Sequence, residues 1–136
     1  MIELALKPRT MEIRPQPLTI LVVEDEPLIA LDIEDALTTL GVTVRLARSI
    51  AEARRSLAAV PQPDLVLLDV VLPDGSSFEL AQEILAKGMP LVFLTGYDHG
   101  IPEELRAVTV VDKPFSTEAL ITVVGRYSTP GRTETG

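Results

Sequence analysis

The sequence predicts a doubly wound α/β fold: a single five-stranded parallel sheet of strand order 2-1-3-4-5, with helices on both faces. Five short apolar runs alternate with segments of helical periodicity between residues 18 and 127. The runs that begin at Thr19, Leu65 and Leu91 are apolar throughout, which is typical of strands buried on both faces of a parallel sheet. Because crossovers between parallel strands are right-handed, the carboxyl ends of all five strands are expected on one side.

The first strand and the first helix have clear boundaries. Strand Thr19–Val23 ends at acidic residues, and Pro27 suits the first helical turn because proline lacks an N–H that would be unsatisfied there. Gly41 marks the end of this helix. Its apolar residues recur at helical spacing and are Ile29, Ile33, Leu37 and Leu40.

The remaining elements are bounded by similar signals. Two capping boxes, Ser49 with Glu52 and Ser76 with Glu79, predict the starts of the second and third helices, and Pro73-Asp74-Gly75 predicts a turn. The second strand carries a threonine and an arginine and is expected at an edge of the sheet. The expected ranges are strand Val42–Leu46, a helix from Ser49 toward Leu57, strand Leu65–Leu68, a helix from Ser76 to a stop at Gly88, strand Leu91–Leu94, barely more than one helical turn within Pro102–Arg106, strand Val108–Val111, and a helix from Ser116 to about Tyr127.

Chain length and termini indicate one domain. A chain of 136 residues is long enough for one complete core and too short for two domains of comparable size. Residues 1–17 contain three prolines and are expected to form an irregular arm, and residues 128–136 are expected to form a flexible tail. The folded domain is therefore expected to span residues 18–127. The arm lacks the apolar segment of a signal peptide or membrane span, so we expect a cytoplasmic protein without membrane contact.

Composition argues against several classes of function. The net charge is −8 and the twelve basic residues are scattered, whereas binding to a nucleic-acid backbone requires a concentrated basic surface. On these grounds we expect no direct contact with nucleic acid. The chain has no cysteine, which excludes disulfides, a thiolate nucleophile and a cysteine-based zinc site.

Five polar residues each follow an apolar run: Glu24, Asp25, Asp69, Thr95 and Lys113. In this fold the ligand crevice lies at the switch point between strands 1 and 3, where Asp25 and Asp69 are expected. Three neighbouring carboxylates repel one another unless a cation lies among them. Because the ligands are oxygens only, Mg²⁺ is the expected ion, together with the Lys113 ammonium.

This combination predicts phosphoryl transfer to the protein itself. Asp69 is the expected nucleophile toward phosphorus, and Mg²⁺, the Thr95 hydroxyl and the Lys113 ammonium would each neutralise one equatorial oxygen. The product, an aspartyl phosphate, is hydrolysable and suits a switch. A single aspartate after a strand is usually a turn former or a helix cap, but capping does not require the hydroxyl and the lysine at the neighbouring strand ends.

These residues resemble those of a response-regulator receiver domain, a CheY-like, flavodoxin-like fold, over about residues 18–127. The motifs that carry the resemblance are the acidic pair Glu24-Asp25, Asp69 within Leu67-Leu68-Asp69-Val70, Thr95, and Lys113-Pro114-Phe115. The resemblance implies that Asp69 is the phosphoacceptor. It also implies a two-component or phosphorelay system, with a histidine kinase or histidine phosphotransfer protein as the donor.

The resemblance further implies roles around the metal. Asp25 and Asp69 would bind Mg²⁺ directly together with the backbone carbonyl of Val71, and Glu24 would contribute through water. The Lys113-Pro114 peptide bond would be cis.

Two departures from the family pattern concern the switch. The position three residues before the lysine, usually aromatic in receivers, is Val110. The segment Phe93-Leu94-Thr95-Gly96-Tyr97 resembles the subgroup named for a Phe-Ala-Thr-Gly motif, which includes stand-alone receivers, with Leu94 in place of its alanine. Tyr97 is therefore the candidate signalling aromatic.

Three alternatives differ in function. A phosphohydrolase would carry a second acid two residues after the nucleophile, and that position is Val71, so only self-phosphorylation and slow autodephosphorylation are expected and not enzymatic turnover. A non-phosphorylated pseudo-receiver scaffold would normally have lost an acidic or lysine position. The chain also fits a receiver excised from a hybrid histidine kinase. In each receiver case the output is expected through binding to a downstream protein.

Overall fold

The computed structural model describes residues 18–96 and 100–128 and contains a five-stranded parallel sheet. The strand order is β2-β1-β3-β6-β7, which confirms the predicted order 2-1-3-4-5. The short strands β4 and β5 pair only with each other, in an antiparallel hairpin that was not predicted. The strands are β1 (Thr19–Val23), β2 (Thr43–Ala47), β3 (Leu65–Asp69), β4 (Val71–Leu72), β5 (Gly75–Ser76), β6 (Leu91–Thr95) and β7 (Thr109–Asp112).

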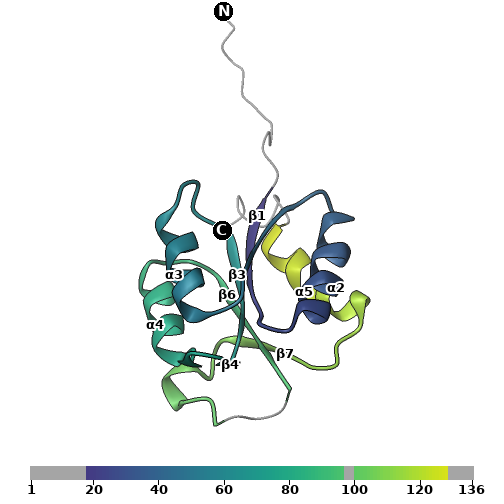
Figure 1. Ribbon diagram of the computed structural model, residues 1–136. Helices are drawn as coiled ribbons and strands as arrows, with labels where there is room; N and C mark the ends of the chain where they lie inside the picture. Colours follow the sequence, from purple (N-terminus) through teal and green to yellow (C-terminus); the bar gives the residue numbers. More distant parts are fainter. Residues whose placement is uncertain (1–17, 97–99, 129–136) are drawn as a thin grey trace, which may run out of the picture.

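Helices cover both faces of the sheet, as predicted (Figure 1). Helices α2 and α5 lie on one face, and α3 and α4 lie on the other. The expected short turn between the last two strands is a 3-10 helix, η2. The bounds are α2 (Pro27–Thr38), α3 (Ile50–Ala58), α4 (Phe78–Ala86), η2 (Glu103–Leu105) and α5 (Thr117–Ser128).

The central strands are buried on both faces, which explains their continuous apolar runs. In β3, Val66 and Leu68 pack in the cluster formed with α3 and α4, whereas Leu65 and Leu67 pack in the cluster formed with α2 and α5. All five residues of β3 and all five of β6 are buried. The side chains thus alternate between two cores, as the period of two in a strand requires. Strand β2 lies at an edge and is largely exposed or half-buried, as predicted.

The first capping box is largely confirmed. Ser49 is the N-cap of α3, and its hydroxyl accepts a hydrogen bond from the Glu52 amide at 3.1 Å. The Glu52 carboxylate accepts in return from the amide of Arg48, at 2.9 Å, rather than from the amide of Ser49. The sequence signal therefore located the start of this helix correctly.

The second capping box is wrong. Ser76 belongs to strand β5, where it pairs with Val71, so the helix begins later, at Phe78. The N-cap is Ser77, whose side chain does not cap α4 but donates a hydrogen bond to the Val70 carbonyl at 3.0 Å. Ser76, which the local sequence pattern assigned to the helix, is instead part of the β4–β5 hairpin.

Other boundaries differ by one or two residues from those expected. Helix α2 ends at Thr38 rather than Leu40, before Gly41, whose positive φ of 78° ends the helical course. Ser128, expected in the tail, is the last residue of α5. The arm, the rest of the tail and Tyr97 lie outside the described residues. Within the described ranges, no helix has both the length and the apolar character needed to cross a membrane.

Candidate functional site

The structure brings the predicted residues to one end of the sheet. Glu24 and Asp25 directly follow β1, Asp69 ends β3, Thr95 ends β6 and Lys113 directly follows β7. Because these four strands are parallel, their carboxyl ends lie side by side.

The strand register shows how closely the ends match. Val23 of β1 is opposite Leu68 of β3. Glu24 and Asp69 each follow one member of this pair, so they occupy equivalent positions at the ends of neighbouring strands. Asp69 is in turn opposite Leu94 of β6. A shift of one residue would turn the Asp69 side chain to the opposite face of the sheet, so this register is what brings Asp69 beside Glu24.

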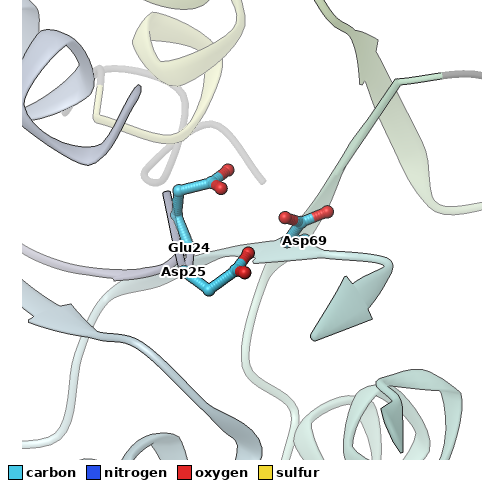
Figure 2. A group of neighbouring side chains, drawn as sticks. All are labelled: Glu24, Asp25 and Asp69. Carbon is cyan, nitrogen blue, oxygen red and sulfur yellow. The ribbon is translucent and has the colours of Figure 1, made fainter. Parts of the chain in front are cut away.

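The three carboxylates form one acidic cluster. Glu24, Asp25 and Asp69 each offer a carboxylate oxygen, and these oxygens lie within 4.8 Å of one another. Figure 2 shows the side chains of Glu24 and Asp25 extending from the end of β1 toward the side of Asp69. Glu24 and Asp69 are buried, whereas Asp25 is half-buried. Water and ions can therefore reach the cluster from the side of Asp25.

Lys113 joins two of these carboxylates. Its Nζ lies 2.7 Å from Oε1 of Glu24 and 3.1 Å from Oδ2 of Asp69. The second carboxylate oxygen of Glu24, Oε2, accepts a hydrogen bond from the Glu26 amide at 3.1 Å. The Glu24 side chain is completely buried, so its charge depends on these few contacts for stabilisation.

Burial and neighbouring charges shift the pKa values of both partners. Burial raises the pKa of Glu24, the contact with Lys113 lowers it, and the Asp69 charge raises it, so that it lies above its ordinary value. Burial by itself would lower the pKa of Lys113, but the Glu24 and Asp69 carboxylates outweigh burial and raise it. The lysine is therefore an ammonium at neutral pH. Three carboxyl groups therefore share a single ammonium in this cluster.

The ends of β6 and β7 are joined next to this cluster. Thr95 is 2% exposed, and its carbonyl oxygen accepts a hydrogen bond from the Lys113 amide at 2.6 Å. This bond fixes the backbone from which the lysine side chain reaches Asp69. The Lys113-Pro114 peptide bond is cis, as the family resemblance implied.

The remaining predicted site residues have different outcomes. Val71 begins β4, two residues after Asp69, and its side chain is exposed. Its carbonyl as a metal ligand stays a prediction. Val110 lies on the edge strand β7 and is 39% exposed. Tyr97 is outside the described residues, so its role as a switch also stays a prediction.

Two residues near the site had no predicted tertiary role. Asp74 was expected only to form a turn, but its carboxylate accepts hydrogen bonds from the amides of Ile50 and Ala51. Ser77 is fully buried and contacts the Val70 carbonyl through both its amide and its hydroxyl. For Asp74, sequence separation hides the contact, because its partners are 24 and 23 positions away.

The residues present fit a magnesium ion. The three clustered side chains offer carboxylate oxygens, the ligand type that hard divalent cations prefer, and their spacing allows one ion to contact more than one of them. Three carboxyl groups gathered around one ammonium favour a divalent cation among them on electrostatic grounds.

Comparison with known proteins agrees with this geometry. The family model described as "Response regulator receiver domain" matches residues 20–125. The chain is 35% identical to the probable transcriptional regulatory protein TcrX of Mycobacterium tuberculosis over 117 residues, covering 78% of this chain and 47% of TcrX. It is 35% identical over 112 residues to the phyllosphere-induced regulator PhyR of Methylorubrum extorquens, covering 79% of this chain and 42% of PhyR. The chain thus spans less than half the length of both relatives.

Solved structures extend the likeness to the fold. The solution structure of the Erythrobacter litoralis PhyR receiver domain has 30% identity and a TM-score of 0.71, covering 82% of this chain and 90% of that one. The response regulator TrrA of Thermotoga maritima, determined in complex with Mg²⁺-BeF, has 31% identity and a TM-score of 0.73, covering 81% of this chain and 98% of that one. On the family match and this geometry, the chain belongs to the response regulator receiver domain family.

Proposed function

We propose that this receiver accepts a phosphoryl group on Asp69 in a Mg²⁺-dependent reaction, from a histidine kinase or a histidine phosphotransfer protein. The observation that carries the proposal is the position of Lys113 Nζ, 3.1 Å from Asp69 Oδ2 at the edge of an acidic cluster. A carboxylate that serves only as a cap needs no half-buried ammonium beside it. A carboxylate that receives a phosphoryl group needs a cation for the added charge.

The side chains divide the work of transfer. A carboxylate oxygen of Asp69 forms the new bond to phosphorus, and the bond from phosphorus to the donor nitrogen or oxygen breaks, its electron pair leaving with the donor. The Lys113 ammonium neutralises charge on one phosphoryl oxygen. The Thr95 hydroxyl, at the end of the adjacent strand, donates to another. This division is positioning and charge neutralisation, the main protein contribution to phosphoryl transfer.

Magnesium would be held by Asp25, Asp69 and the backbone carbonyl of Val71, with Glu24 acting through water. When bound, the ion supplies positive charge for the phosphoryl oxygens. The contact with Lys113 lowers the pKa of the buried Glu24 against the larger effect of burial, and so favours the charged form that attracts the ion.

The partners follow from the same chemistry. Val71 stands where a phosphohydrolase would carry its second acid, so the chain accepts and slowly loses the phosphoryl group but does not turn over a separate substrate. The relatives TcrX and PhyR are named as regulators, which supports signalling as the role. We expect the phosphorylated domain to act by binding a downstream protein.

A groove beside the site offers a surface for the donor. It lies between α2 and α5, has a volume of about 750 Å³, and reaches Lys113 and Pro114 at the cis peptide bond. Leu28 and Leu31, on the first turns of α2, are exposed by 76% and 51%. Both leucines belong to the helix that lines one side of the groove, and contiguous exposed apolar side chains are typical of a protein contact surface. A donor bound there would contact Lys113, whose ammonium lies 3.1 Å from Asp69 Oδ2.

Incubation with acetyl phosphate and Mg²⁺ is expected to add one phosphoryl group to the intact protein, detected by mass spectrometry. Asp69→Ala is expected to gain nothing, because the acceptor oxygen is absent. Glu104→Ala removes an exposed carboxylate on η2, outside the groove, and serves as the matched control, with the same gain as the unmodified protein. A phosphoryl group on Asp69→Ala would contradict Asp69 as the acceptor. No phosphoryl group on the unmodified chain with any divalent metal would contradict the proposal and favour a scaffold role.

Magnesium is expected to stabilise the folded domain before any phosphorylation. At a concentration about 100 times its Kd, the ion raises the free energy of unfolding by about 2.7 kcal/mol through linkage. Asp25→Asn removes a predicted ligand, so the same addition is expected to have a much smaller effect. Urea unfolding with and without Mg²⁺ at constant ionic strength measures both values. Equal stabilisation of the two proteins would rule out Asp25 as a ligand.

A further inference from the structure

The hairpin of β4 and β5 immediately follows the phosphoacceptor. Asp69 ends β3, β4 begins at Val71, and the turn Pro73-Asp74-Gly75 leads into β5. Figure 1 shows β4 at the lower end of the sheet, the end where β3 leads into it. The predicted carbonyl ligand of Val71 is therefore part of this hairpin. Its direction depends on what holds the hairpin in place.

The tip of the hairpin is attached to helix α3 through one side chain. The two carboxylate oxygens of Asp74 accept hydrogen bonds from the amides of Ile50, at 2.9 Å, and Ala51, at 3.1 Å. The bond from Ile50 is the main cause of a lowered pKa of Asp74, so the carboxylate is ionised at neutral pH. Because Ser49 takes the amide of Glu52, each of the first three amides of α3 has a side-chain acceptor.

The base of the hairpin is held by a second set of bonds. The Val70 carbonyl accepts from both the amide and the hydroxyl of Ser77, each at 3.0 Å. The Val70 amide donates to the carbonyl of Leu94 on β6, at 3.1 Å. Val71 therefore directly follows Val70, whose backbone amide and carbonyl are both hydrogen-bonded. On the C-terminal side, Val71 leads into the hairpin tip, which Asp74 attaches to α3.

We infer that Asp74 is a positioning residue for the metal: by attaching the hairpin tip to α3 it fixes the direction of the Val71 carbonyl. The inference rests on the proposed magnesium site. Without the Asp74 bonds, the hairpin keeps its two-residue antiparallel pair and the buried Leu72 side chain, but the turn beyond Leu72 loses its polar attachment to α3, and such short hairpins are marginal by themselves. Binding an ion would then require ordering the hairpin, which weakens affinity without changing the ligands.

Calorimetric titration with Mg²⁺ tests this role directly. Asp74→Ala is expected to bind Mg²⁺ roughly tenfold more weakly than the unmodified protein, the lower end of the range for residues that orient metal ligands. Asp74→Asn keeps one acceptor oxygen and is expected to recover part of the affinity. In acetyl phosphate reactions, the Asp74→Ala rate is expected to return to the unmodified rate at saturating Mg²⁺, because the residue does not contact the phosphoryl group.

Ser49→Ala is the matched control. It removes a side-chain cap from the same end of α3 but leaves the bonds between Asp74 and the helix. Unchanged Mg²⁺ affinity in Ser49→Ala and weaker affinity in Asp74→Ala would support the inference. Equal weakening in both would assign the effect to helix stability and overturn it. If the unmodified protein and Asp74→Ala bind Mg²⁺ with equal affinity, the inference about Asp74 is overturned but the magnesium site stands. If the unmodified protein does not bind Mg²⁺, the magnesium site is overturned as well.

Discussion

Lys113→Met is expected to lower the free energy of unfolding by about 2 kcal/mol at pH 7 without divalent cations. Methionine keeps much of the apolar stem but removes the ammonium, which leaves the buried Glu24 carboxylate without its cation. Removal of one partner from a fully buried pair costs about 3–5 kcal/mol, and the 17% exposure of the lysine side chain reduces this value. The Asp69 carboxylate loses the same partner.

The loss is expected to depend on pH in a defined direction. The pKa of Glu24 is raised in the folded protein, so its contribution to stability is fully present below its ordinary value of 4.5 and is lost as pH rises through the folded value. Removing the ammonium raises this pKa further, because the lysine contact lowers it. The stability difference between the two proteins should therefore be smaller at pH 5 than at pH 7. The raised pKa of Lys113 affects stability only in alkaline solution.

Urea unfolding in EDTA at several pH values measures this difference. Lys87→Met, at an exposed lysine that ends α4, is the matched control and is expected to change stability by no more than about 0.5 kcal/mol. If Lys113→Met and Lys87→Met have the same stability at every pH, the ion pairs of Lys113 contribute nothing. In Mg²⁺ and acetyl phosphate, Lys113→Met is also expected to slow phosphorylation by roughly 10²–10³, as loss of one charge-stabilising donor does.

Phe93→Ala is expected to lower the free energy of unfolding by about 3–5 kcal/mol, the range for deletion of a buried phenyl ring. Phe93 is fully buried in the middle of β6, the strand that ends at Thr95. Its ring meets that of Phe78 on α4 edge to face, with centroids 6.0 Å apart. The cavity left by alanine would lie in the core between the sheet and helices α3 and α4.

Phe115→Ala is the comparison for Phe93→Ala, because it makes the same substitution at a less buried phenylalanine. Phe115 is only partly buried, against the α2 and α5 face, so a loss of about 1–2 kcal/mol is expected from the smaller apolar area. Urea or thermal unfolding measures both variants. A larger loss for Phe115→Ala than for Phe93→Ala would contradict the packing of β6 described above.

The fold was predictable to a large extent because its signals are local. The apolar runs of β1, β3 and β6 are continuous since both faces are covered, and Pro27 and Gly41 bound α2 through their backbone chemistry. Strand order followed from the handedness of crossovers and the composition of the edge strands. The failure at Ser76 has the same origin: a capping pattern is local, and the pairing of Ser76 with Val71 prevailed over it.

The chain order of residues was enough to place Asp69, Asp25 and Lys113 at one end of the sheet, because in a parallel sheet every residue that follows a strand emerges on the same side. Sequence did not show that Lys113 pairs with Glu24 as well as Asp69, nor that Asp74 attaches the hairpin to α3. Such contacts join side chains and amides far apart in the chain, and no periodicity or neighbouring residue records them. They form only when packing of the strands and helices brings those groups within hydrogen-bonding distance.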